Sequence, residues 1–288
     1  MTSTLRQRSG RLPEAVTSFV GRRTARADVR RLLEGSRLVT LTGVGGVGKT
    51  RLALQVARDV RRAFPDGVWL AELAKLDDDS LVDSAVAAAL ELSDSSGRAL
   101  IDVLVDYLAD KRLLVVLDNC EHLLPACARL TSRLLSEAPE LRVLATSRDR
   151  LAIGAEQVWL VPPLSVPEPD SLTSGTARQY EAMTLFEDRA SSVLPGFRLG
   201  PENEAAVARL CRQLDGLPLA IELAAGLAEG VVGGTDPGSV VGSVRHPDER
   251  RPNRGGAAPD AAGSGGVELR PVSGAGADVV GQVLGVLR

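Results

Sequence analysis

Apolar residues follow two alternating patterns over the first 165 positions of the chain. One is a short apolar run, typical of a strand that is buried on both faces of a parallel sheet. It occurs at residues 67–73, 113–118 and 141–145, and residues 37–42 form a short β-rich run that also predicts a strand. The other is apolar residues at helical spacing, which occupy residues 24–33, 50–60, 81–92, 100–108 and 123–135. This alternation predicts an α/β domain with a doubly wound parallel sheet.

The strand pattern ends after this region. Residues 157–161 indicate an edge strand that Pro162 and Pro163 terminate, and no strand pattern follows Pro169. Three helical segments come next, and Pro201 suits the first turn of the second one. They occupy residues 180–194, 201–214 and 219–227. We expect them to form a small helical lid on the α/β domain.

From about residue 228 the periodicity is lost. Glycine and proline recur every few residues, so this tail is predicted to be disordered. The patterns together divide the chain into a flexible N-terminus at 1–14, the α/β domain at 15–168, the lid at 169–227 and the tail at 228–288.

A glycine-rich stretch directly follows the first predicted strand. Residues 43–50 fit G-x-x-x-x-G-K-[ST], the phosphate-binding P-loop. Glycines let successive backbone N–H groups point at phosphate oxygens, and the following helix directs its positive end at the same anion. Lys49 would reach the β- and γ-phosphates, and the Thr50 hydroxyl would ligate Mg²⁺. The predicted nucleotide contacts here are Gly43, Val44, Gly45, Gly46, Val47, Gly48, Lys49, Thr50 and Arg51.

Two further polar residues end predicted core strands. Asp118 closes the apolar run 113–118, which is the Walker B pattern, whose acid holds Mg²⁺ in P-loop NTPases. Arg148 follows the run 141–145, where it would meet a γ-phosphate. In open α/β sheets ligands bind at this carboxyl edge. We therefore predict Lys49, Asp118 and Arg148 as catalytic residues, with Thr50 and Asp118 as metal ligands.

Charge and composition bear on the partners and the cellular compartment that we expect for this protein. The formal net charge of −3 gives no global argument for nucleic acid or an anionic membrane as partner. No apolar run approaches the length of a membrane span, so we expect a cytoplasmic protein. The three cysteines, Cys120, Cys127 and Cys211, fit buried thiols in a reducing compartment.

Several stretches in this order resemble one family, the NB-ARC (apoptotic ATPase) branch of the STAND class of P-loop NTPases. The similarity is greatest to bacterial LuxR-type and AfsR-like transcriptional regulators, and it covers roughly residues 15–227. The stretches are 19–22 (Phe-Val-Gly-Arg), 43–50, 117–122 (Leu-Asp-Asn-Cys-Glu-His), 145–148, 162–164 and 214–224.

The resemblance implies an ATP- and ADP-binding switch that uses Mg²⁺ and self-associates in the ATP state. It implies that Phe19 and Val20 lie near the adenine, that Pro218 packs on the base, and that Arg148 senses the γ-phosphate. The chain itself shows no DNA-reading motif.

Two departures from the family pattern affect the expected activity. Asn119 stands where fast P-loop ATPases usually place a glutamate, and an amide cannot act as a general base. We expect Glu121 to point elsewhere, and hydrolysis to be slow or absent. The family also continues into a winged-helix segment that is not recognisable here, and His246 lacks the context of its histidine.

The chain is therefore expected to be C-terminally truncated. Codons permitted for residues 258–270, read one nucleotide later, encode a segment similar to a family helix, so the tail is predicted to be frameshifted. Two alternatives to the switch remain open on the sequence. One is a P-loop enzyme such as a small-molecule kinase or another ATPase, and the other is an inactive fragment.

Overall fold

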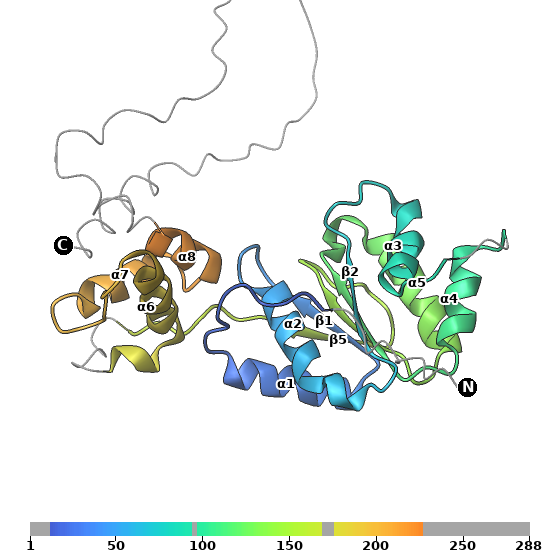
Figure 1. Cartoon of the computed structure of the whole chain (residues 1–288), viewed down its shortest axis with the longest axis horizontal. Helices are drawn as coiled ribbons and strands as arrows, with labels where there is room; N and C mark the ends of the chain where they lie inside the picture. The colour runs from blue at the N-terminus through green and yellow to red at the C-terminus, as the bar shows by residue number, and fades with distance from the viewer. Residues whose placement is uncertain (1–11, 94–96, 169–175, 227–288) are drawn as a thin grey trace, which may run out of the picture.

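A five-stranded parallel sheet forms the centre of the protein in its computed structural model (Figure 1). The structure describes residues 12–93, 97–168 and 176–226. The strand order is β2-β3-β4-β1-β5, and all pairs are parallel. The strands are β1 (Leu38–Thr42), β2 (Val68–Glu72), β3 (Leu114–Asp118), β4 (Arg142–Thr146) and β5 (Glu156–Leu160). The predicted doubly wound fold is confirmed.

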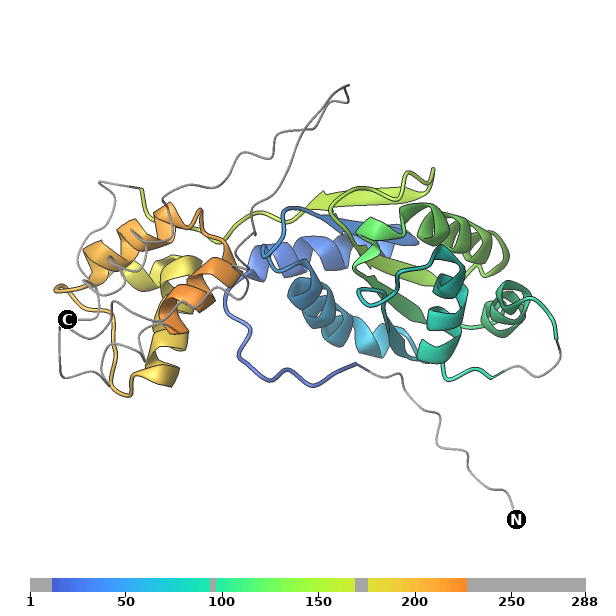
Figure 2. The ribbon, with the colours of Figure 1, turned by 90° about the horizontal axis from the view of Figure 1, so that it is seen from above.

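Helices cover both faces of this sheet (Figures 1 and 2). Two pack on one face: α1 (Arg23–Gly35) and α2 (Lys49–Val60). Three pack on the other: α3 (Val82–Ala89), α4 (Leu100–Leu108) and α5 (Leu124–Glu137). All residues of β1 and β3 are buried, as the apolar run of β3 predicts for an interior parallel strand, and β1 also buries Thr40 and Thr42. β5 lies at the sheet edge, where Val158 and Leu160 remain exposed.

A separate apolar core holds the lid, which consists of α6 (Glu181–Val193), α7 (Glu204–Gln213) and α8 (Pro218–Gly226). Phe186 and Phe197 meet edge to face there, with ring centroids 5.9 Å apart. The turn before α8 fits tightly against the segment that follows β5, because Leu164 N donates to Gly216 O at 2.9 Å. Gly216 has a φ of 62°, and a Cβ at this position would lie 2.3 Å from Leu164 O, so only glycine fits.

Two helix starts differ from the prediction. Pro201 lies in a turn before α7, which begins only at Glu204, because Gly200 N donates to Asn203 Oδ1 and closes that turn. A 3-10 turn, Asp79–Leu81, precedes α3, and Asp78 caps it by accepting from Ser80 N.

Some of the predictions fall on residues that the structure does not describe. The predicted disordered and frameshifted tail lies outside the described residues, as does most of the predicted flexible N-terminus. The domain boundaries stay a prediction. All three cysteines are free and buried, as expected. In the described part of the chain, no helix combines the length and apolar character that a membrane span requires.

Candidate functional site

The P-loop connects β1 to α2 at the carboxyl edge of the sheet. Lys49 folds back over it, and Nζ donates to Gly43 O at 2.8 Å and to Val44 O at 3.2 Å. Burial lowers the pKa of the Lys49 ammonium, and the Glu121 carboxylate acts in the opposite direction. The loop thus forms a tight turn, and the Lys49 side chain lies across it.

A hydroxyl and carboxylate cluster lies beside the loop. Asp118, at the end of β3, accepts from Thr50 Oγ1 at 2.7 Å and from Thr146 Oγ1 at 2.6 Å. Thr146, at the end of the neighbouring β4, also accepts from the backbone N of Asn119 at 3.0 Å. The set is a carboxylate with hydroxyls, which are the hard oxygen donors that suit Mg²⁺. Within the described residues no group of three or more His, Cys, Asp or Glu could hold a metal alone, and a magnesium site completed by phosphates does not need one.

The structure brings Glu121 to the site, contrary to our expectation that it points elsewhere. Asn119 adopts a φ of 66°, and this left-handed residue turns the chain directly after β3. Glu121 Oε1 then lies 3.3 Å from Arg148 Nε, while its Oε2 is buried without a hydrogen-bond partner. Arg148 itself is largely exposed, and its guanidinium reaches toward Gly45 of the loop.

The residues predicted to hold the base also come together. Phe19, Val20, Gly48, Arg51 and Pro218 line one small cavity of about 30 Å³ between the P-loop and the lid. A cavity of this volume holds about one water molecule. The predicted adenine-side residues are therefore neighbours, around a space that is smaller than a base.

Arg22 also lines this cavity, and we had assigned it no separate role. It is only 5% exposed, and its Nη2 donates to Val47 O at 2.6 Å. Its backbone N donates to the carboxylate of Glu181 at the start of α6. Burial lowers the pKa of the Arg22 guanidinium, and Glu181 opposes that shift. Arg22 thus ties the P-loop, the N-terminal segment and the lid together.

Glu222 on α8 forms a second connection, between α2 and the lid, which the sequence analysis does not predict. Its Oε1 accepts from Arg51 Nη1 at 2.7 Å and from Arg189 Nε at 3.0 Å. Both arginines also donate to Ser18 O, Arg51 at 2.6 Å and Arg189 at 3.0 Å. We call these four residues the lid latch.

The lid also bonds the P-loop through its backbone. Leu219 N donates to Gly46 O at 3.2 Å. Gly46 has a φ of 78°, and a Cβ there would lie 3.1 Å from the Leu219 Cβ. The phosphate loop and the first turn of α8 therefore approach each other closely.

Comparison with known proteins agrees with this geometry. Residues 24–159 match the NB-ARC domain. The chain is 46% identical over 197 residues to a Mycobacterium tuberculosis (strain ATCC 25618 / H37Rv) protein named "Putative HTH-type transcriptional regulator Rv0890c", covering 68% of this chain and 21% of that protein. It is 32% identical over 234 residues to the regulatory protein AfsR of Streptomyces griseus, covering 74% and 21%. The alignments thus span about a fifth of the length of these two relatives.

A solved structure shares the fold. The Walker-type ATPase PABY2304 of Pyrococcus abyssi superposes with a TM-score of 0.52 at 14% identity, covering 76% of this chain and 69% of that one. At this identity the likeness concerns the fold alone. Taken with the NB-ARC match, the parallel sheet and the regulator relatives, it leads to one conclusion: residues 24–159 of this chain form an NB-ARC domain with the fold of P-loop NTPases.

Proposed function

We propose that this chain is the nucleotide-dependent switch of a signalling or transcriptional regulator, which binds ATP and ADP with Mg²⁺ and hydrolyses ATP slowly. The observation that carries this proposal is the hydrogen bond from Leu219 N to Gly46 O. Because the lid bonds the phosphate loop itself, phosphates in the loop and the position of α8 influence each other.

The chain's own residues have distinct parts in this proposal. The backbone N–H groups of the loop and Lys49 bind the phosphates, and Thr50 and Asp118 hold the metal ion. When bound, Mg²⁺ would neutralise phosphate charge. Phe19, Val20, Arg51 and Pro218 surround the base and its sugar.

Arg148 distinguishes the two nucleotides. Only ATP offers a γ-phosphate, and charge-assisted bonds to phosphate are stronger than an exposed ion pair. Arg148 then leaves Glu121 for the phosphate. Hydrolysis is slow because Asn119 stands directly after Asp118, and an amide is not a base.

The names of the relatives support the wider setting, since one is named a putative HTH-type transcriptional regulator and the other a regulatory protein. We place the protein in the cytoplasm and propose self-association in the ATP state. In this scheme DNA recognition, if the regulator has it, belongs to regions outside the matched segment.

Calorimetry tests nucleotide binding. Lys49→Ala removes a charge-assisted contact and should weaken Mg-ADP and Mg-ATP binding by about 1.5–3 kcal/mol. Lys75→Ala is the matched control, because Lys75 is an exposed lysine in the segment after β2. Equal affinity of the parent chain and Lys49→Ala would show that the P-loop assignment is wrong.

A further inference from the structure

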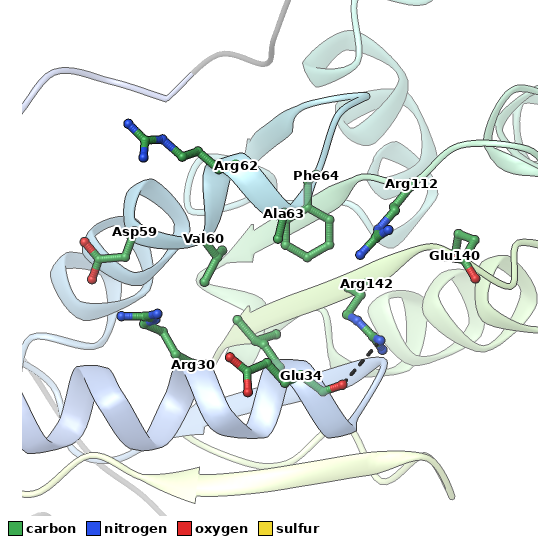
Figure 3. Close-up of a pocket in the computed structure, with 11 residues that line it drawn as sticks. Arg30, Glu34, Asp59, Val60, Arg62, Ala63, Phe64, Arg112, Glu140 and Arg142 are labelled. Carbon is green, nitrogen blue, oxygen red and sulfur yellow. Dashed lines mark hydrogen bonds between the residues drawn. The ribbon is translucent and has the colours of Figure 1, made fainter.

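A second pocket lies at the opposite edge of the sheet from the P-loop (Figure 3). It has a volume of about 330 Å³, within the usual range of small-molecule sites. The last turns of α1 and α2 form its walls, together with Arg112, which precedes β3, and Arg142, the first residue of β4. Strands begin at this edge, so no part of the nucleotide site lies here.

Two arginines dominate one wall of this pocket. Leu114 and Arg142 are register partners on adjacent parallel strands, and Arg112 precedes Leu114 by two residues. Residues two apart in extended chain share a face, so both arginines project on the α1 and α2 side. Figure 3 shows both of them to one side of the Phe64 ring. Their like charges repel each other unless an anion lies between them.

Neither arginine is neutralised by a carboxylate among the described residues. The side chain of Arg142 makes one long bond, from Nη2 to Glu34 O at 3.5 Å. Arg112 donates its backbone N to Asp66, which leaves its guanidinium available. The pocket therefore presents guanidinium groups that still have unused donors.

The charge of the remaining lining groups favours an anion. Arg30 and Arg62 add two more guanidinium groups. Of the three acids that line the pocket, Asp59 is already paired with Arg26 in a fork at 2.7–2.9 Å. The lining therefore contains four arginines and, besides Asp59, two carboxylates, Glu34 and Glu140.

The floor of the pocket is apolar. Phe64, Leu33 and Val60 line it beneath the charged groups. A guanidinium fork binds phosphate in a bidentate manner, and an apolar floor accommodates a ring or hydrocarbon part. We propose that this pocket binds a small organic phosphate, with its phosphate on Arg112 and Arg142 and its apolar part on Phe64.

Titration with phenyl phosphate tests the proposal. The chain is first saturated with Mg-ADP so that the P-loop does not take up the probe. We expect binding that Arg112→Gln with Arg142→Gln weakens at least tenfold. The control combines Arg133→Gln and Arg209→Gln, two exposed arginines outside the pocket, and should bind as the parent does. Absence of binding to the parent, or equal affinity of both double variants, would overturn the proposal.

Two measurements on the unaltered chain do not depend on the folding of a variant. Phenyl phosphate should protect Arg112 and Arg142 from modification by phenylglyoxal, as mapped by mass spectrometry, and should leave Arg209 equally reactive. Inorganic phosphate should bind severalfold more weakly than phenyl phosphate, because it does not contact Phe64. Unchanged reactivity of the two pocket arginines contradicts the site, and equal affinity for the two probes contradicts the role of its apolar floor.

Discussion

At the residue scale, Arg148 and Glu121 form the ion pair that a γ-phosphate would meet in the proposed switch. The Arg148 side chain is 67% exposed and that of Glu121 is 19% exposed. Such a partly solvated pair contributes at most about 1 kcal/mol. Glu121 Oε2 has no hydrogen-bond partner in its buried position, so the carboxylate gains from any added donor. The pair is therefore weak enough for a phosphate to displace.

Glu121→Gln should raise the affinity for ATP relative to ADP, because Arg148 no longer has a competing carboxylate. The ratio of dissociation constants for ATPγS and ADP, measured by calorimetry, checks this expectation. Arg148→Gln is the companion variant and should lower the same preference. An unchanged ratio in both variants would mean that Arg148 does not contact the γ-phosphate.

Local spacing in the sequence is enough to predict where some of the candidate site residues lie. Lys49 and Thr50 are fixed by the loop itself, and Asp118 by the strand that it ends. Glu121 was misjudged because its direction depends on the left-handed Asn119, a conformation that asparagine tolerates and that the pattern does not encode. The contact of Arg22 with Glu181 joins residues 159 positions apart, which no local pattern reports.

At the element scale, the lid latch concentrates several bonds on one acid of α8. Glu222 is partly buried, with 26% of its side chain exposed, and accepts from arginines of α2 and α6. Helix α8 therefore connects the phosphate-binding helix to the rest of the lid. The three lid helices were predictable from their apolar spacing, but the latch was not, because it joins residues of distant segments.

Glu222→Ala should lower the free energy of unfolding by about 1–3 kcal/mol, because it leaves Arg51 and Arg189 without their shared acceptor. Denaturant titration measures this loss. Glu137→Ala is the control, since Glu137 forms an exposed pair with Arg133 one helical turn away and should cost less than about 0.5 kcal/mol. Similar losses in the two variants would show that the latch does not stabilise the lid.

At the scale of the whole molecule, one parallel sheet separates two sites with different chemistry. Strand ends carry Asp118 and Thr146 at the carboxyl edge, and Arg112 and Arg142 lie at the opposite edge. The apolar runs made the sheet predictable. The contact of the lid with the P-loop was not predictable, since two separate apolar cores meet there mainly through polar and backbone groups.

The steady-state rate of ATP hydrolysis tests whether the chain acts as a switch or as an enzyme. The purified chain should hydrolyse ATP far more slowly than a typical enzyme, for which turnover is on the order of 10 per second. Asn119→Glu should raise the rate if the new carboxylate reaches the attacking water, because a carboxylate accepts a proton and an amide does not. Turnover of the unaltered chain at the typical value would favour an enzyme over a switch.

The size of the small cavity between the P-loop and α8 bears on the rate at which a bound nucleotide would be exchanged. At about 30 Å³ it is too small for a purine in this conformation, so in the proposed switch the residues around it, including those of α8, would have to move before a base enters or leaves. The rate of nucleotide exchange would then equal the rate of this opening and would not increase with the concentration of free ATP. A switch of this kind would respond with a delay, because its bound nucleotide would reflect the ATP and ADP concentrations at its last opening and not the present ones.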